Sequence, residues 1–195
     1  MMKRFFVLLL LSFAVQSFQN ASARNVSEAE DANDDYFLDS FPVPPSTPNQ
    51  LFYLQRTPNT NTIVYELNLE NGRINNEEPI HIYWIRYPEG GVIKELNYVQ
   101  KHFAYGVKAE PLNDGRYRLT FAAYKKRNFY LSLAARDNKY HVYGTINNKM
   151  AMLIRVFIQI DPGGTFWAPN VKYIDIKGRE TGTGKEVVER ILISK

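Results

Sequence analysis

The sequence predicts a mainly β protein: an antiparallel sandwich or flattened barrel of about nine or ten strands with one packed amphipathic helix. Three observations support this fold class. Apolar and polar residues alternate with the period of a half-buried strand in many short segments, as at Tyr117 to Ala123. Turn residues separate these segments at close intervals, which is typical of a meander or sandwich. A helical period occurs in one segment, Val92 to Phe103. A closed ligand-binding barrel of the lipocalin type is the alternative.

The first predicted hairpin joins residues 51–56 to residues 62–69. Its turn is TPNTN at residues 57–61, where Pro58 presets the backbone and asparagine tolerates left-handed conformations. In the second strand Ile63, Tyr65, Leu67 and Leu69 fall on one face, as expected of a half-buried strand.

The next segment contains a strand and the predicted helix. Residues 80–87 form a strand rich in aromatic residues around Trp84, and PEGG at residues 88–91 ends it. Apolar residues then recur at spacings of four, three and four, which predicts an amphipathic helix of about three turns. We expect this helix to cap a barrel end or cover a sheet edge.

The rest of the chain is predicted to form strands separated by turns. Met150 to Ile160 is the most continuous apolar run after the N-terminal region, so it should be a central strand. The predicted strands after the helix are residues 105–110, 117–123, 129–133, 140–146, 150–160, 171–177 and 187–193.

The N-terminus has the pattern of a secretory signal peptide at residues 1–23. Lys3 and Arg4 precede the apolar run Phe5 to Val15, and the small residues Ala21, Ser22 and Ala23 follow as a cleavage site. We therefore expect an exported protein, periplasmic or extracellular. The apolar run is shorter than the roughly 20 residues of a membrane-spanning helix, so no transmembrane segment is expected after cleavage.

Residues 24–50 are expected to form a disordered leader, followed by a single β-rich domain at residues 51–195. The leader is acidic up to Ser40, with six Asp and Glu residues against Arg24 alone, and then proline-rich. Such composition lacks the apolar residues that a packed core needs.

The composition excludes several kinds of chemistry. The chain has no cysteine, so it has no disulfide framework, thiol nucleophile or thiolate metal site. His81, His102 and His141 lie on different predicted elements without metal-ligand spacing, so we expect no metal and no cofactor. The net charge of +4 comes without an arginine-rich block, so we expect no nucleic acid partner.

The abundance of aromatic residues, 14% of the chain, favours a binding module for a small amphiphile, a glycan or an envelope protein. Rings offer stacking area, while nearby cations fix an anionic group. The crowded strand around Trp84 has a second interpretation, as a core anchor. The predicted ligand-binding residues are Arg56, Tyr83, Trp84, Arg86, Tyr98, Tyr105 and Trp167.

Two other classes of function remain open. One is an envelope hydrolase that uses two carboxylates, although the sequence identifies no catalytic residue and favours binding over catalysis. The other is an assembly protein that pairs with another chain through exposed edge strands.

The loop at residues 161–170, DPGGTFWAPN, carries two rings among glycines and prolines. Leaving such rings in water would cost about 1.5–3 kcal/mol each. We therefore predict that Phe166 or Trp167 folds back against the strand around Trp84 or the helix around Tyr98.

Four blocks of the sequence stand out together: FYLQRTPNTNTIVYELN (52–68), EPIHIYWIRYPEGG (78–91), ELNYVQKHFAYGV (95–107) and VKYIDIKGRETGTGKEVVERI (171–191). In this combination they resemble a family of exported bacterial proteins, domain of unknown function 4833. The resemblance covers about residues 51 to 193. It implies an exported, β-rich domain and transfers no activity, cofactor or catalytic residue.

Overall fold

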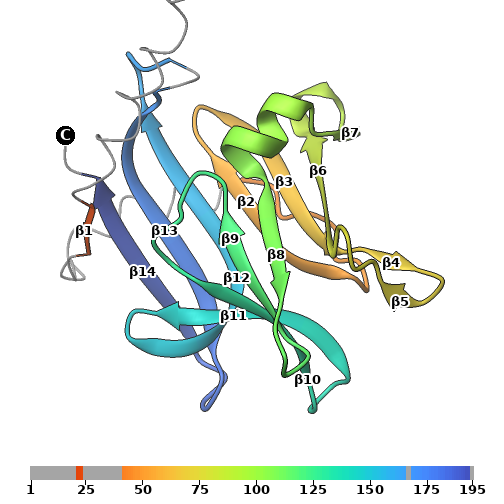
Figure 1. The fold of residues 1–195 in the computed structure, drawn as a ribbon. Coiled ribbons are helices and arrows are strands. Elements are labelled where there is room, and N and C mark those ends of the chain that lie inside the picture. The colour runs from red at the N-terminus through yellow and green to blue at the C-terminus, as the bar shows by residue number, and fades with distance from the viewer. Residues whose placement is uncertain (1–20, 24–40, 166–167, 194–195) are drawn as a thin grey trace, which may run out of the picture.

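The computed structural model describes residues 21–23, 41–165 and 168–193, and it confirms a mainly β fold (Figure 1). In this part of the chain twelve strands form one sheet, and β4 and β5 form a separate hairpin. The strands are β1 (Ala21–Ala23), β2 (Gln50–Arg56), β3 (Asn59–Leu67), β4 (Leu69–Glu70), β5 (Arg73–Ile74), β6 (Ile80–Arg86), β7 (Val92–Glu95), β8 (Val107–Pro111), β9 (Tyr117–Phe121), β10 (Phe129–Ala134), β11 (Lys139–Ile146), β12 (Lys149–Asp161), β13 (Asn170–Glu180) and β14 (Glu186–Ile193).

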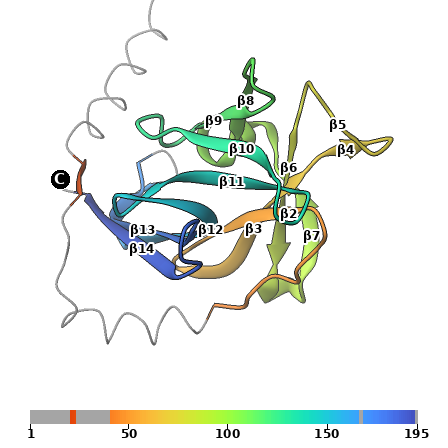
Figure 2. The same ribbon diagram turned by 90° about the horizontal axis from the view of Figure 1, so that it is seen from below.

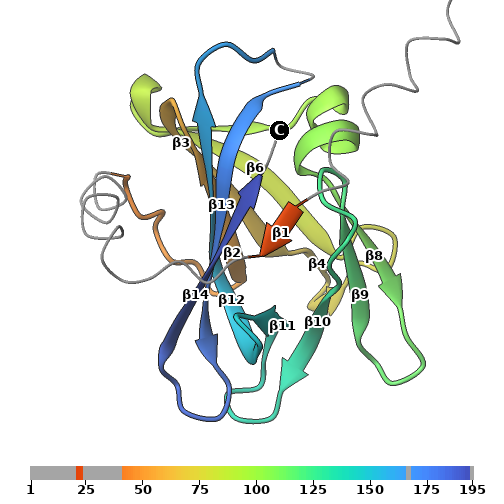
Figure 3. The same cartoon turned by 90° about the vertical axis from the view of Figure 1, so that its left-hand side faces the viewer.

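The sheet runs in the order β7-β6-β3-β2-β12-β11-β10-β9-β8 and branches at β12. One edge of β12 pairs first with β11, at residues 149–152, and then with β2, at residues 155–158. The other edge pairs with β13, which in turn pairs with β14, and β1 lies beside β14 (Figure 3). The β2–β12 pairing is parallel and the other described pairings are antiparallel, as the sequence predicts for most of the sheet. The long apolar strand is thus central.

A β-bulge at Ile154 divides β12 into its two halves. Before the bulge, Ala151 and Leu153 face the main core, whereas after it Val156 packs against that core and Phe157 faces the other side. An extra residue reverses the alternation of side chains and bends the strand. The bulge therefore separates two lobes, β2-β3-β6-β7 and β8-β9-β10-β11, which curl toward each other as a half-barrel (Figure 2).

The main hydrophobic core fills the space between the two lobes. Phe52 of β2 stacks on Tyr65 of β3 with ring centroids 4.2 Å apart, and Phe121 of β9 packs edge-on against Phe52 at 5.8 Å. Leu119 and Leu131 from the second lobe are fully buried in the same cluster. The curl of the sheet thus joins residues from both lobes in one core.

The segment from Phe41 to Asn49 lies against the outer face of the sheet. Phe41 is buried, with its ring 5.2 Å from that of Phe157, and the side-chain amide of Gln55 donates a hydrogen bond of 2.8 Å to the carbonyl of Pro42. The predicted disordered leader spans residues 24–50; residues 24–40 of it lie outside the described part of the chain, and residues 41–49 are the segment that packs on the sheet.

The predicted helix at residues 92–103 is wrong in its first half. Val92–Glu95 is the edge strand β7, in register with β6 from Arg86 to Tyr83. Gly90 and Gly91 both have φ of 80°, a left-handed conformation that favours glycine, and they turn the chain back on itself. β-Branched Val92 and Ile93 suit a strand better than a helix. The apolar spacing was misleading, because Val92 and Phe103 are both exposed.

In the described part of the chain, helical structure consists of the 3-10 helix η2 (Tyr87–Glu89) and a short segment that ends in the π-helix η3 (Gln100–Tyr105). The backbone amide of Gln100 donates to the side chain of Asn97, and the amide of Asn97 donates to Oε1 of Gln100, at 2.9 and 3.1 Å. This reciprocal arrangement is a capping box, so the helix begins at Asn97. At its end, a Cβ on Gly106 would lie 1.8 Å from the carbonyl oxygen of Lys101, so only glycine fits there.

No helix in the described part of the chain is long and apolar enough to cross a membrane. Phe166 and Trp167 lie outside the described residues, so their predicted return to the domain stays a prediction.

Candidate functional site

A cavity of about 400 Å³ opens where the β2–β3 hairpin, the end of β6, the edge strand β7 and the start of the helical segment meet. We name it the Arg56 cavity. Its lining combines a tryptophan with charged groups and amides: the ring of Trp84, the cations Arg56, Arg86 and Lys94, the carboxylate Glu95, and the amides Asn59, Asn61, Asn97 and Gln100.

Trp84 forms the inner wall of this cavity and also belongs to the core. It is 7% exposed, and its ring packs edge-on against Tyr105 at 5.2 Å. The indole Nε1–H donates to Oε1 of Gln100 over 3.4 Å, the oxygen that also accepts the Asn97 amide. The capping box therefore fixes the start of the helix against the tryptophan.

Tyr105, at the end of η3, packs behind Trp84 and contacts Arg56. Burial raises the pKa of the Tyr105 hydroxyl, and the charge and hydrogen bond of Arg56 lower it in part. The hydroxyl therefore stays protonated at neutral pH and contributes no negative charge to neutralise the guanidinium.

The cations of the cavity differ in whether a nearby carboxylate neutralises their charge. Arg86 and Lys94 both form ion pairs with Glu89, the latter at 3.4 Å, and Glu95 is held by His81 at 2.9 Å. Arg56 makes no ion pair with any described carboxylate.

Two polar atoms beside the cavity have no hydrogen-bond partner in the described structure. They are Nε of Arg56, a donor, and Oδ1 of Asn61, an acceptor, and both are buried. A buried polar group without a partner is costly, and an uncompensated guanidinium more so. The guanidinium of Arg56 donates through Nη1 to the carbonyl of Thr57 over 3.3 Å, but no described carboxylate neutralises its charge.

The structure brings together three of the seven predicted binding residues, Arg56, Trp84 and Arg86, and places Tyr105 behind them. Two others, Tyr83 and Tyr98, lie elsewhere. Tyr83 faces the opposite side of β6, where its hydroxyl donates to Glu66 over 3.0 Å. Tyr98 is 70% exposed and stacks on His102 at 4.0 Å. Trp167 lies outside the described residues.

Six lining residues escaped the sequence prediction: Asn59, Asn61, Lys94, Glu95, Asn97 and Gln100. The pair Asn-x-x-Gln at residues 97–100 carried a readable signal, because a capping box marks a helix start. Asn59 and Asn61 have the sequence pattern of ordinary turn residues. They lie beside Trp84 only because β3 pairs with β6, with Ile63 opposite Trp84.

The described carboxylates do not form a catalytic pair in the Arg56 cavity, where Glu95 is the single acid. Hydrogen bonds lower the pKa of three exposed carboxylates: Asp114 through Arg116, Asp137 through His141, and Glu180 through Thr183. The described residues also contain no cluster of three or more metal ligands.

Comparisons with known proteins gave one match. Searches of curated proteins and of solved structures found none. A family model described as a domain of unknown function (DUF4833) matches residues 52–190, which span β2 to β14 and include every residue that lines the Arg56 cavity. The chain therefore belongs to the DUF4833 family.

Proposed function

We propose that this protein is an exported binding module, periplasmic or extracellular, that holds an acidic glycan in the Arg56 cavity. The observation that carries the proposal is Arg56 itself, a guanidinium beside Trp84 that lacks a carboxylate partner among the described residues. A ligand carboxylate would supply the missing charge in the bidentate geometry that arginine favours. The signal peptide pattern at residues 1–23 supports export.

The amides favour a glycan over an amphiphile in this cavity. Each of the four amide side chains carries both donors and acceptors, which suits the hydroxyl groups of a sugar. The apolar surface is limited to Trp84, most of which is buried by Tyr105. An acyl chain would find little area to cover here.

The same lining argues against the hydrolase alternative. Glycoside hydrolysis commonly needs two carboxyl groups about 5–9.5 Å apart on either side of the scissile bond. With Glu95 alone, and that carboxylate held by His81, the described residues of the cavity can bind and orient a sugar but lack the second acid.

The proposal is tested by calorimetry with digalacturonate and its uncharged counterpart galactobiose. We expect digalacturonate to bind and Arg56→Gln to weaken binding at least tenfold, because a charge-assisted hydrogen bond contributes about 1.5–3 kcal/mol. Arg73→Gln, a matched change on the exposed hairpin β4–β5, should bind as the wild type does.

Three outcomes would contradict the proposal. Equal binding of galactobiose would remove the role of the charge. Equal binding of acetate would show a simple anion site. Undiminished binding by the Arg56→Gln variant would place the ligand elsewhere.

A second candidate function is pairing through an edge strand. β7 ends the strand order, and its residues Val92 and Ile93 are 47% and 63% exposed. Apolar edges pair readily with other chains. If β7 mediates assembly, light scattering should show an oligomer that Ile93→Lys converts to a monomer; a wild-type protein that is already monomeric would contradict this function.

A further inference from the structure

A second cavity of about 480 Å³ lies on the outer face of the second lobe, and we name it the Met152 groove. Its floor follows a row of cross-strand neighbours, with Tyr130 opposite Tyr143, Tyr143 opposite Met152, and Met152 opposite Arg179. Because successive side chains of a strand point to opposite faces, these residues face away from the core positions Leu131, Val142 and Ala151. The groove is therefore separated from the main core by the sheet itself.

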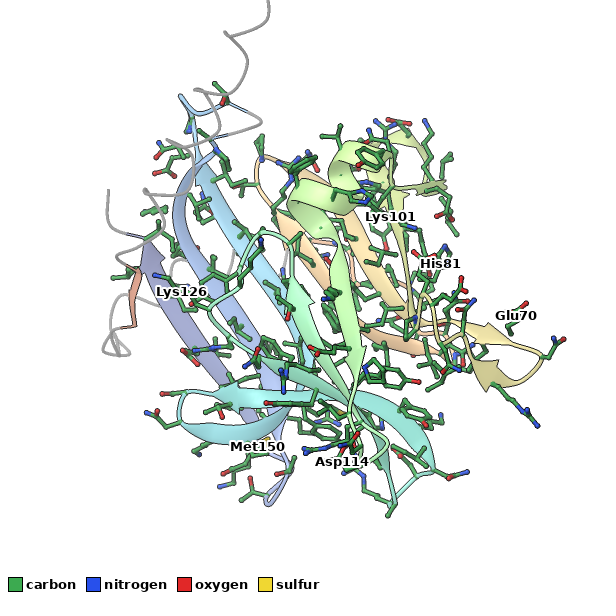
Figure 4. The ribbon with its side chains drawn as sticks, viewed as in Figure 1. Glu70, His81, Lys101, Asp114, Lys126 and Met150 are labelled. Carbon is green, nitrogen blue, oxygen red and sulfur yellow. The ribbon has the colours of Figure 1, made fainter. Side chains whose placement is uncertain are left out.

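The floor of the groove is apolar and adaptable. Two tyrosine rings and two methionines line it, and Met150 is 54% exposed near the turn between β11 and β12 (Figure 4). Methionine side chains adapt to irregular apolar ligands. This surface therefore offers what the Arg56 cavity lacks, an area for an apolar body.

Three arginines surround this floor. Arg116 lies over the ring of Tyr130 with its Cζ 5.2 Å from the centroid, and it also pairs with Asp114. Arg136, in the turn after β10, and Arg179, on β13, make no ion pair with other described residues.

The single carboxylate of the lining, Glu180, is already engaged by Thr183 and Lys149. It therefore does not neutralise the two unpaired arginines, and the groove is apolar below and positively charged at its rim.

We propose that the Met152 groove binds a small anionic amphiphile, with the apolar body on the tyrosines and methionines and the acidic group at Arg136 and Arg179. Charge complementarity selects the anion, because neither guanidinium group makes an ion pair in the described part of the chain, although Arg136 interacts electrostatically with Asp137 and Tyr143. The apolar floor selects against the polar saccharide proposed for the Arg56 cavity. This site is independent of that proposal, since the two cavities share no lining residue.

The chain offers a direct reporter of this site. It has four methionines, of which Met1 and Met2 lie at the N-terminus and Met150 and Met152 both line the groove. In protein labelled with ¹³C at the methionine methyl groups, Met150→Leu and Met152→Leu variants assign the two groove signals. Octanoate is the anionic probe, and octanol and octyltrimethylammonium are probes with the same chain but no negative charge.

We expect octanoate to shift both groove signals saturably, and octanol and octyltrimethylammonium to do so at least tenfold more weakly. The variant Arg136→Gln/Arg179→Gln should weaken octanoate binding at least tenfold, and both substitutions lie on exposed positions that the fold tolerates. Arg73→Gln, on the exposed hairpin β4–β5, is the matched control and should leave octanoate binding unchanged.

Three results would overturn the proposal. An absence of shifts with octanoate would show that no such site exists. Equal shifts with octanol would reduce the groove to an apolar patch. A peptide of residues 28–39 could also shift both signals as much as octanoate does. If octanoate then displaces this peptide no better than octanol does, the groove binds an acidic peptide segment instead.

Discussion

Replacing Glu189 with alanine is expected to lower the free energy of unfolding by about 3 kcal/mol, at the lower end of the range for breaking a buried ion pair. Glu189 of β14 is 9% exposed and binds both terminal nitrogens of Arg127, at 2.9 and 2.5 Å. It also accepts the backbone amide of Asn147 at 2.6 Å. The substitution leaves a partly buried guanidinium and a backbone amide without their acceptor. Chemical denaturation measures the change.

The control for this substitution lies on the same strand. Glu186 is 58% exposed on its side chain and pairs with Lys177 at 2.6 Å. An exposed ion pair contributes about 0–1 kcal/mol, so Glu186→Ala should change stability by no more than that. A loss from Glu189→Ala as small as that from Glu186→Ala would contradict the structural role of the Arg127 pair.

Because of the Glu189 carboxylate, we expect the free energy of unfolding to depend on pH. Burial raises the pKa of Glu189, but the hydrogen bonds of Arg127 and Asn147 outweigh it and hold the pKa below its usual value. Because the pKa of Glu189 is lower in the folded state, its ionised form stabilises the fold. This contribution is complete above the pKa of the unfolded state, about 4.3, and is lost as the pH falls through the pKa of the folded state. Stability of the wild type should therefore fall more steeply below this pH than that of Glu189→Gln. If the stabilities of the wild type and of Glu189→Gln fall in parallel as the pH is lowered, this role of the Glu189 carboxylate is contradicted.

Tyr65→Ala is expected to destabilise the protein by about 3–5 kcal/mol, the cost of removing a large aromatic side chain from a core. Tyr65 is fully buried, stacks on Phe52, and donates a hydrogen bond of 2.9 Å to the carbonyl of Tyr105. That bond joins β3 to the end of η3, which packs behind Trp84. Loss of the ring should therefore also weaken digalacturonate binding.

Tyr65→Phe separates the two effects, because it keeps the ring and removes the hydroxyl. Its expected cost is about 1 kcal/mol, the contribution of one hydrogen bond. Thermal or chemical denaturation of both variants gives the comparison. If Tyr65→Ala and Tyr65→Phe cost the same, the stacking on Phe52 contributes nothing and the description of the core is wrong.

Much of the fold could be predicted from local patterns. The alternation in residues 62–69 placed Ile63, Tyr65, Leu67 and Leu69 on one face, and the structure buries the first three but ends the strand at Leu67 and exposes Leu69. Turn residues separated the strands because their backbone conformations are set locally, as with the positive φ of Asn138 and Asn147.

What failed depended on contacts distant in sequence. Val92 to Glu95 has a helical spacing, but pairing with β6 decided its conformation. The branch at β12 could not be predicted, because it follows from a bulge at Ile154 that no turn residue marks.

The candidate site was found only in part for the same reason. Arg56, Trp84 and Arg86 stood out because cations beside a rare ring are noticeable in a sequence. The hairpin asparagines did not, since asparagine in a turn has an ordinary local explanation. Tyr83 was assigned to the site although it is next to Trp84 in the chain, and neighbours in a strand face opposite sides of a sheet.

The NMR signal of the Trp84 indole N–H tests most directly whether the Arg56 cavity binds an acidic glycan. The chain has two tryptophans, so a Trp167→Phe variant leaves one indole signal, from the ring that lines the cavity. Titration with digalacturonate should shift this signal saturably, with the affinity found by calorimetry, while the methyl signals of Met150 and Met152 stay in place. An indole signal that does not move at saturating digalacturonate would contradict the claim.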